Sequence, residues 1–392
     1  MWWSDLGRPT PLTAEEEASA AAIALARRFN PAMAFSDRDL WPVEVRYTWR
    51  DGADLIAETI GPEGDVVGER VAVVNADLNQ HPWGELPVAD EQGRAIRYRV
   101  DAPGDDRSRA GRTRWRERWA ALVGKQGKKT SEPSHPAVER AFAPTQHAHL
   151  FWWNRDQGLL AVQYWFFYPF NEWVNRHEGD WEHVNVILQG PSHLQDPDAF
   201  RPVGYRFSFH SLCLDTDRVM RVAGPDPAGD HVVVFVGGRG RLLWWSGTAS
   251  GASYPLPAFY RRVGSGPIKP DEDTRHVKRF LAPQDFQIVM LPEPERLDSR
   301  AHPELSWLKL PFYAGQARMR SNPPLIDWLG NGGPVLQPAR RLDWHARRNK
   351  PPFPGRPLRI RHLALPWALL YAPFAAPAPA LADAVTHAPI GS

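Results

Sequence analysis

The clearest hydrophobic pattern in the chain runs from Leu159 to Gln189. Its first part, Leu159 to Pro169, is apolar, aromatic and β-branched, which is typical of a buried strand that the proline would end. A polar loop from Asn171 to Gly179 follows, and Asp180 to Gln189 again has the composition of a strand. The pattern therefore predicts two neighbouring antiparallel strands joined by a loop of roughly ten residues.

Alternation along the second predicted strand places two carboxylates on one face. Asp180 and Glu182 share the face that continues as Val184, Val186 and Leu188, because successive side chains of a strand point to opposite sides. Two unpaired carboxylates beside an apolar stripe are costly to bury, so a cation, arginines or water must compensate them. With His177 close by, these oxygen and imidazole donors form a candidate ligand set for a divalent ion.

A plainer interpretation of the same segment stays open. The loop could be solvated, with Asp180 and Glu182 in ion pairs to arginines such as Arg176, since structural ion pairs are common. His183 falls on the face opposite the carboxylates, together with Trp181, and is predicted to be a hydrogen-bonded histidine rather than a ligand.

The remaining pattern consists of one helix and several strands. Thr13 can cap a helix that continues to Phe29, and Glu16 completes a capping box with it. Alternating or β-branched runs predict further strands over Leu40–Trp49, Val66–Val74, Val203–Leu212, Val232–Val236 and Phe286–Leu291.

Composition supports a mainly β protein. Among 392 residues there are 18 Trp and 39 Pro, and helical periodicity is sparse, which favours strands with long Pro-punctuated connections. The single cysteine, Cys213, cannot form an intrachain disulfide and fits a reducing compartment. No signal-peptide pattern begins the sequence, and its most apolar run, 363–382, is interrupted by prolines. A cytoplasmic protein, with peripheral membrane contact as an option, is the expectation.

Charge is unevenly spread although the formal net charge is only +2. Arg107–Lys129 and Arg340–Arg361 are strongly basic and could attract phosphate groups of an anionic membrane. Within the first patch, Trp115, Trp119 and Leu122 have the spacing of one helix face, which fits a docked surface helix or a membrane-surface helix. No nucleic-acid-binding motif accompanies the arginines, so no nucleic-acid partner is expected.

These patterns suggest four segments along the chain. Residues 1–100 would hold the N-terminal helix and the first strands of a sandwich, and 101–146 a basic helical insertion. Residues 147–322 would form the core β-sandwich, and the Pro- and Arg-rich residues 323–392 would wrap around it.

The central segment resembles a known protein family. Tyr164–Asn171 (YWFFYPFN) and His177–Val184 (HEGDWEHV) are similar to the signature of the vacuolar protein sorting-associated protein 62 family. The segment is more distantly similar to the necrosis- and ethylene-inducing-protein-like toxins, whose Asp-Trp-Glu contributes to a cation site in a β-sandwich. Further similar pieces are Phe207–His210, His231–Phe235 and Ser250–Pro255, with Gly251 where the family usually has histidine.

The resemblance implies a jelly-roll-like β-sandwich with a few peripheral helices, long Pro-rich loops and a divalent-cation site at its rim. The expected metal ligands are His177, Asp180, Glu182 and His210, with His177 and His210 also as catalytic acid/base groups; further candidates are His231, Ser253 and Tyr254. Carboxylate ligands favour Mg²⁺, Ca²⁺ or Mn²⁺, and each added histidine favours Zn²⁺ or Fe²⁺.

Three functions remain open at this point. The ion could activate water in a metal-dependent hydrolase. Alternatively, the protein could be a non-enzymatic binder of an anionic lipid or membrane surface, taking a small polar or lipid-headgroup ligand. Thirdly, the motif could be structural and hold no ligand, which the glycine at position 251 favours slightly.

Overall fold

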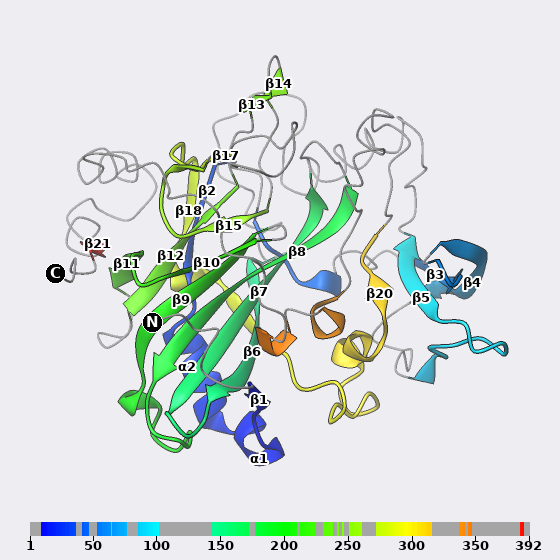
Figure 1. Ribbon diagram of the computed structural model, residues 1–392, viewed down its shortest axis with the longest axis horizontal. Helices are drawn as coiled ribbons and strands as arrows, with labels where there is room; N and C mark the ends of the chain where they lie inside the picture. Colours follow the sequence, from blue (N-terminus) through cyan, green and yellow to red (C-terminus); the bar gives the residue numbers. More distant parts are fainter. Residues whose placement is uncertain are drawn as a thin grey trace.

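The computed structural model describes the chain over a set of separate ranges (Figure 1). They are 9–36, 41–46, 53–63, 65–76, 85–101, 143–171, 177–209, 212–223, 230–237, 241–242, 245–246, 251–260, 272–315, 337–341, 344–346 and 385–387. The predicted helical insertion, including Trp115, Trp119 and Leu122, lies outside them, as does most of the basic segment Arg340–Arg361.

A seven-stranded sheet, termed here the first sheet, contains the central segment. Its strand order is β1-β6-β7-β8-β9-β10, with β19 beside β6 (Figure 1). The strands are β1 Thr10–Pro11, β6 Thr145–Asn154, β7 Leu159–Asn171, β8 His177–Gln189, β9 Arg201–Phe209, β10 Leu212–Thr216 and β19 Gln287–Met290. The predicted antiparallel pair is confirmed as β7 and β8, which stay paired along their whole length.

Pro169 does not end its strand, contrary to the sequence prediction. β7 continues to Asn171, which lies opposite His177, so the connection is shorter than expected. The pairing of β7 with β6 stops at Trp165. Beyond that point one edge of β7 carries no paired strand among the described residues, and a proline is tolerated where its missing N–H would face such an edge.

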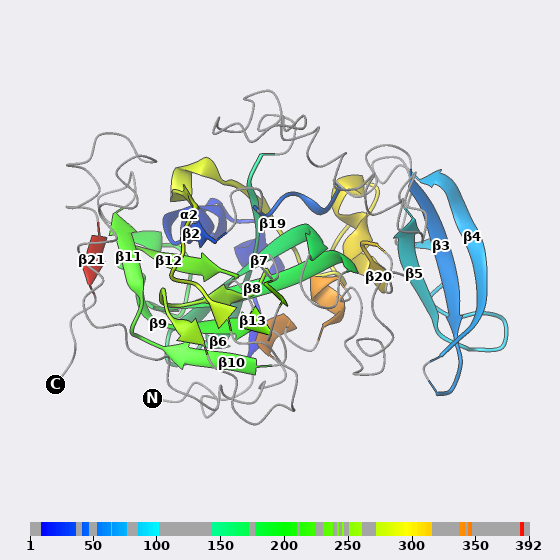
Figure 2. The ribbon, with the colours of Figure 1, turned by 90° about the horizontal axis from the view of Figure 1, so that it is seen from above.

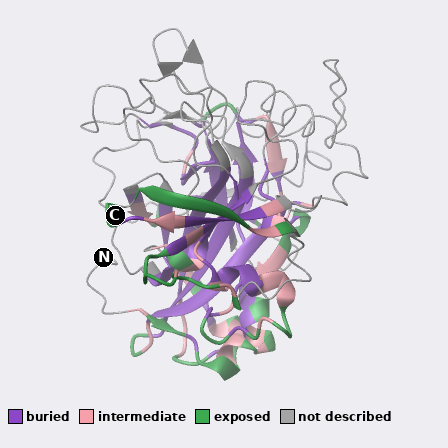
Figure 3. Cartoon of the chain, turned by 90° about the vertical axis from the view of Figure 1, so that its right-hand side faces the viewer, coloured by how far each residue is buried: buried purple, intermediate pink, exposed green. Residues whose placement is uncertain are grey.

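The second sheet has the order β18-β2-β12-β11-β21, with β15 beside β12. Its strands are β2 Ala32–Phe35, β11 Met220–Ala223, β12 Asp230–Val236, β15 Ser253–Tyr254, β18 Arg279–Leu281 and β21 Val385–His387. Apolar side chains of both sheets belong to one continuous buried cluster, among them Tyr164, Val184, Met33 and Phe235. The protein is therefore mainly β, in a sandwich-like arrangement with the core between the sheets (Figure 3).

A third sheet stands beside the sandwich. Its order is β20-β5-β3-β4, from β3 Ala53–Ile60, β4 Val66–Ala76, β5 Ile96–Asp101 and β20 Phe312–Tyr313 (Figure 2). The strand predicted over Val66–Val74 is confirmed as β4. The division of the chain into four segments stays a prediction.

The predicted N-terminal helix is present but is interrupted. Thr13 and Glu16 form the expected capping box at the start of α1, Ala14–Glu17. Ser19 then caps a second helix, α2 Ala20–Arg28, by accepting a hydrogen bond from the backbone N–H of Ala22 at 3.2 Å. A serine side chain that bonds the backbone competes with helix continuation, which explains the break.

The strand predicted over Leu40–Trp49 is wrong for the part of it that is described, 41–46, which contains no strand. Pro42 lacks an N–H, and the segment makes single bonds to two different strands instead of a ladder. Val43 N donates to Phe167 O at 3.0 Å, and Thr145 N donates to Pro42 O at 2.9 Å.

Short elements complete the fold. They are the hairpins β13 Arg241–Leu242 with β14 Trp245–Ser246 and β16 Phe259–Tyr260 with β17 Glu272–Asp273, and the 3₁₀ helices η4 Pro197–Ala199, η5 Pro283–Asp285, η6 Pro303–Lys309, η7 Pro338–Arg340 and η8 Trp344–Ala346. Among the described helices, none has the length and apolar character required to span a bilayer.

Candidate metal centre

The face of the first sheet opposite the sandwich core carries several buried polar side chains among its apolar ones. His147 and His149 of β6 lie on this face; Gln163 of β7 is opposite His149, and Asn185 of β8 is opposite Gln163. All four are at most 1% exposed. Trp344 of η8 covers this face, stacking on the ring of His149 at a centroid distance of 3.6 Å.

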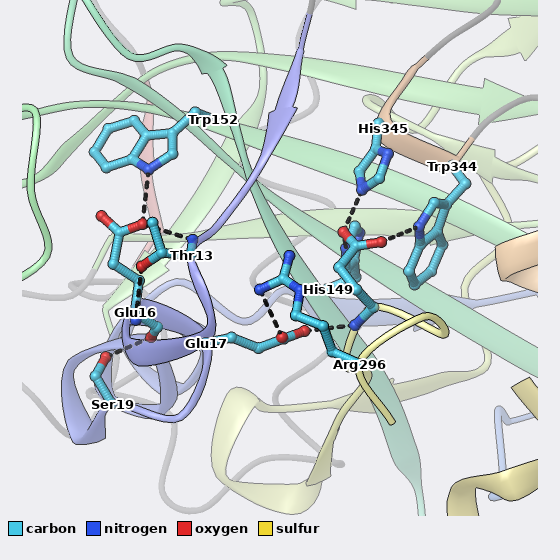
Figure 4. A network of polar contacts seen from close by, with 10 residues as sticks. Thr13, Glu16, Glu17, Ser19, His149, Trp152, Arg296, Trp344 and His345 are labelled. Atoms are coloured by element: carbon cyan, nitrogen blue, oxygen red, sulfur yellow. Dashed lines mark hydrogen bonds and ion pairs between the residues drawn. The ribbon is translucent and has the colours of Figure 1, made fainter. Parts of the chain in front are cut away.

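Three metal-ligating side chains meet under this cover: His149, Glu293 and His345 (Figure 4). Their ligand atoms all lie within 4.8 Å of one another, and all three residues are buried. Glu293 Oε1 is 2.9 Å from His149 Nε2 and also contacts His345 Nε2. Glu293 Oε2 accepts a hydrogen bond from Trp344 Nε1 at 3.2 Å. This group is called the His–Glu–His cluster below.

The fold explains how these residues come together. β19 runs parallel to β6, and Leu291 N extends the pairing by donating to Ala148 O at 2.7 Å. The chain therefore leaves β19 alongside β6 and places Glu293 next to His149. The backbone N–H of Glu293 is fixed from the other side by Glu17 Oε1 of α1, at 2.5 Å.

His345 arrives on a segment that lies across the sheet, here called the strap and comprising residues 337–341 and 344–346. Gln337 anchors it by donating from Nε2 to Leu308 O at 2.8 Å and to Leu310 O at 2.9 Å. Arg341 Nη1 donates to Trp181 O of β8 at 2.7 Å. His345 itself has a φ of 56°, an uncommon conformation for a residue with a side chain. The strap thus holds this imidazole in place at some conformational cost.

Burial determines the protonation of the cluster. It lowers the pKa of His149 to about 4, although the contact with Glu293 opposes the shift. Burial alone would raise the pKa of Glu293, but its hydrogen bonds with His149 and His345 outweigh this effect and lower the pKa of this carboxyl well below its usual range. At neutral pH the site therefore offers a neutral imidazole at position 149 and a carboxylate, the forms that bind a metal ion.

The donor set fits a transition metal. Two imidazoles and one carboxylate are typical of catalytic zinc sites and of non-haem iron sites. Nitrogen and oxygen ligands around one ion are roughly 3 Å or slightly more apart when each lies about 2.0–2.2 Å from it. The observed 2.9 Å separation of His149 Nε2 and Glu293 Oε1 is close to that value. The Trp344 N–H orients the carboxylate, as a second layer of hydrogen bonds does around known metal sites.

The predicted acid pair lies elsewhere, on the core side of the first sheet. Asp180 and Glu182 lie near the start of β8 and are 7% and 6% exposed, on the face that continues into the core as predicted. Tyr168 lies opposite Asp180 on β7. Burial, followed by the charges of Glu182 and Asp180, raises the pKa of the Tyr168 hydroxyl. The two acids and this phenol therefore form one local group.

Gly251 contacts the same group. A Cβ atom at position 251 would lie 2.5 Å from Cδ2 of Tyr168, so the tyrosine ring occupies the space that a side chain would need. The glycine noted in the sequence thus has a packing reason: a histidine could be accommodated at this position only if Tyr168 moved.

The other predicted site residues are distributed over the sandwich. His210 and the side chain of His177 lie outside the described residues. His231 Nδ1 is 2.7 Å from Asn30 O, and the Tyr254 ring contacts the Tyr260 ring at a centroid distance of 4.2 Å. Ser253 is fully buried on β15, a strand that lies beside β8 and β9. The structure therefore brings Asp180 and Glu182 together but leaves the full predicted ligand set a prediction.

Sequence reasoning missed the His–Glu–His cluster. His149 is separated from Glu293 by 144 residues, and Glu293 from His345 by 52, so no local motif connects them. The one available signal was a pair of histidines at alternate positions, 147 and 149, in an otherwise apolar strand. Such a pair indicates a buried polar face without identifying its partners.

No protein-family model matches the chain, and no curated protein matches it. Solved structures of toxin-type proteins align with it weakly. The non-toxic HaNLP3 protein is 12% identical, with 64% of this chain and 76% of that chain covered and a TM-score of 0.25. NLPPya in complex with glucosamine is 15% identical, with 63% and 75% covered and a TM-score of 0.24. Alignments at these scores carry no structural argument, and the resemblance to the vacuolar sorting family stays a prediction.

Proposed function

We propose that the protein binds a divalent metal ion at the His–Glu–His cluster. The observation that carries this proposal is the convergence of three buried ligand atoms, from β6, from the exit of β19 and from the strap, within 4.8 Å of one another. A purely structural ion pair would need only one histidine for the carboxylate. Here two imidazoles contact the same carboxylate oxygen. A metal ion would replace the hydrogen-bonding protons between these groups and bind all three side chains.

The proposed ion is Zn²⁺ or Fe²⁺. The expectation of Mg²⁺, Ca²⁺ or Mn²⁺ was based on carboxylate ligands, whereas this cluster has two imidazoles for each carboxylate. Imidazole nitrogen favours zinc and iron over the oxygen-preferring ions. Three protein ligands also leave a coordination position for water, and metal-bound water ionises near neutral pH. Hydrolysis is accordingly the reaction class proposed for this site.

Metal analysis of purified protein tests the proposal. After incubation with Zn²⁺ and gel filtration, the wild type should retain stoichiometric zinc, and Glu293→Gln should lose it because an amide is a weak ligand. The matched control is Glu182→Gln, a buried carboxylate outside the cluster that should leave zinc binding unchanged. Equal zinc in wild type and Glu293→Gln would refute the site. The hydrolase proposal is tested separately with chromogenic phosphate and carboxylic esters, where activity unaffected by zinc loading or chelation would count against it.

A second candidate cation site is the acid pair Asp180 and Glu182. It is favoured by the placement of both carboxylates on one face of β8 beside the buried Tyr168, which gathers two carboxylates and a phenol in one place. Its ligands would be carboxylate and phenol oxygens, which suit Mg²⁺, Ca²⁺ or Mn²⁺. Isothermal titration with Ca²⁺ and Mn²⁺ should then show binding that Asp180→Asn abolishes and Glu293→Gln preserves.

The anionic-membrane alternative also stays a proposal. The basic patches on which it was based lie almost entirely outside the described residues. Flotation with vesicles containing phosphatidylserine should show binding that is strongest at low salt, because electrostatic attachment is screened as ionic strength rises. Absence of binding at low salt would exclude this mode.

A further inference from the structure

The imidazole ring of His149 lies between polar groups from two neighbouring strands. In the first sheet, β19 and β7 flank β6 on opposite sides. Glu293, at the exit of β19, is 2.9 Å from ring nitrogen Nε2 through its Oε1. On the other side, Gln163 of β7 lies directly opposite His149 in the strand pairing and is fully buried. The ring therefore has a carboxylate on one side and an amide on the other.

The second ring nitrogen of His149, Nδ1, is buried and makes no hydrogen bond of regular geometry. Gln163 is nevertheless close enough to act on the ring. Burial lowers the pKa of His149, and the side chains of Glu293 and Gln163 both oppose this shift, as groups that favour a protonated ring do. Because Nε2 is directed at Glu293, Nδ1 is the nitrogen within reach of Gln163.

Trp165 fixes the orientation of the Gln163 amide. The indole Nε1 of Trp165 donates to Gln163 Oε1 at 2.8 Å, and both side chains are buried. An amide nitrogen cannot accept this hydrogen bond, so the bond determines where the amide oxygen lies. A carbonyl oxygen can accept two hydrogen bonds, so Oε1 can serve Trp165 and His149 together. The oxygen is thus held in place by a side chain that is not itself a metal ligand.

A metal ion changes which nitrogen of His149 carries the proton. Without an ion, the neutral ring donates from Nε2 to Glu293, since a carboxylate only accepts, and Nδ1 then presents a lone pair. With an ion at Nε2, the neutral ring carries its single proton on Nδ1 instead. Metal-binding histidines in known sites donate this N–H to an acceptor, which fixes the ring and makes the bound nitrogen more basic. Acceptors on both sides of His149 therefore suit the metal-bound ring.

We propose that Gln163 is a positioning residue for the metal centre: its amide oxygen, oriented by Trp165, accepts the Nδ1 proton of His149 and thereby directs Nε2 to the ion. This inference rests on the proposed function, because it needs an ion at the His–Glu–His cluster. Gln163 acts through His149 and does not itself bind the ion. Removing the acceptor should leave the three ligands present and weaken their binding of the metal.

Zinc affinity of the full-length protein, measured by competition with an indicator dye, is the first test. Gln163→Leu removes the acceptor, and its dissociation constant for Zn²⁺ should rise by a factor of about 10 to 100. Gln163→Glu keeps an acceptor oxygen and should bind zinc at least as tightly as the wild type. The matched control is Asn185→Leu. It removes a buried amide that lies directly opposite Gln163 and makes no side-chain hydrogen bond, and it should leave the affinity unchanged.

The outcomes separate this inference from the metal site itself. A wild type that binds no zinc overturns both. Equal affinities in the wild type and Gln163→Leu, or an equal loss in Gln163→Leu and Gln163→Glu, overturn only the role of Gln163. The double variant Gln163→Leu/Trp165→Phe also removes the indole N–H that the leucine leaves without an acceptor, and it should bind zinc as weakly as Gln163→Leu. Recovery to the wild-type affinity would assign the loss to that N–H and contradict the proposal.

The second test needs no variant. In the zinc-loaded wild type, isotope-labelled at the histidine nitrogens, nuclear magnetic resonance identifies the His149 ring through its stacking on Trp344 at 3.6 Å. The spectrum should show Nε2 bound to the metal and Nδ1 carrying a proton that exchanges slowly with water, because that proton is buried and hydrogen-bonded. Coordination through Nδ1, or an Nδ1 proton that exchanges as fast as that of an exposed histidine, would overturn the assignment.

Discussion

At the scale of single residues, Gly179 shows why the central motif needs a glycine just before its acid pair. Its φ is +59°, and an added Cβ would lie 2.4 Å from the carbonyl oxygen of Ala314. The glycine therefore lets the start of β8 approach the end of β20 closely. Its role follows from backbone contact and requires no ligand.

Gly179→Ala should lower the free energy of unfolding by more than the cost of placing an alanine at a positive φ. The left-handed backbone costs about 1 kcal/mol for alanine, and the clash adds roughly 2 kcal/mol through forced displacement. Gly93→Ala is the matched control, because Gly93 has a φ of +74° and nothing within 4 Å of the added Cβ. Urea unfolding of both variants measures the difference. Equal destabilisation would show that the approach of Ala314 does not constrain this position.

His147 is the residue expected to make stability depend on pH. It is fully buried, and burial lowers its pKa from 6.5 to about 3, with the positive charge of Arg46 acting in the same direction. In the unfolded chain its pKa returns to about 6.5, so the unfolded state binds more protons between these values. Stability should therefore decrease as pH falls from about 6.5 towards 3, and be independent of this residue above about 6.5.

Thermal unfolding across this pH range checks the expectation. The variant His147→Leu should show a smaller loss of melting temperature on acidification than the wild type. Part of the loss should remain, since His149 has its pKa lowered to about 4 by the same burial. A variant with the same acid dependence as the wild type would mean that His147 is not kept neutral in the fold.

At the scale of elements, the strap is an irregular segment that contributes His345 to the His–Glu–His cluster. Its two short 3₁₀ helices have no ladder, so a few side-chain bonds fix it: Gln337 to the carbonyls of Leu308 and Leu310, and Arg341 to that of Trp181. The position of His345 therefore depends on contacts made well away from the cluster.

Gln337→Leu should loosen the strap and weaken zinc binding at a distance. The leucine leaves two buried carbonyls without their donor, which costs about 2 kcal/mol. Zinc affinity should fall with it, because His345 must then be ordered on binding. Arg340→Ala is the control: this exposed neighbour bonds Lys309 O at the surface and should change little. Competition with a zinc indicator dye measures the zinc affinity of both variants. An unchanged affinity in Gln337→Leu would show that the bonds made by Gln337 do not contribute to zinc binding.

At the scale of the whole molecule, the His–Glu–His cluster links parts that are distant in the sequence: α1 through Glu17, β6, the exit of β19 and the strap. A metal ion bound there would stabilise the folded state as a unit, because the ligands are not assembled in the unfolded chain.

Zinc should therefore raise the melting temperature of the wild type, and chelation should reverse the rise. Free zinc at about 100 times its dissociation constant adds roughly 2.7 kcal/mol. Glu293→Gln should unfold at the same temperature with zinc and with chelator. Differential scanning calorimetry of both proteins decides the matter, and a zinc effect of equal size in the variant would assign the stabilisation to another site.

The sequence by itself determined the local features. The antiparallel pair β7 and β8, the capping box of Thr13 and Glu16 and the shared face of Asp180 and Glu182 all depend on residues close together in the chain. Periodicity and capping are local physics, so they can be read from the order of residues.

Only the tertiary structure decided the rest. Pro169 stays within its strand because the pairing of β7 with β6 has already stopped at Trp165, and α2 is a separate helix because Ser19 bonds its neighbours. The His–Glu–His cluster exists because β19 runs parallel to β6 and the strap contacts both His149 and Glu293. Such positions depend on which strands become neighbours over more than a hundred residues, and the hydrophobic pattern specifies that a face is buried without specifying what covers it.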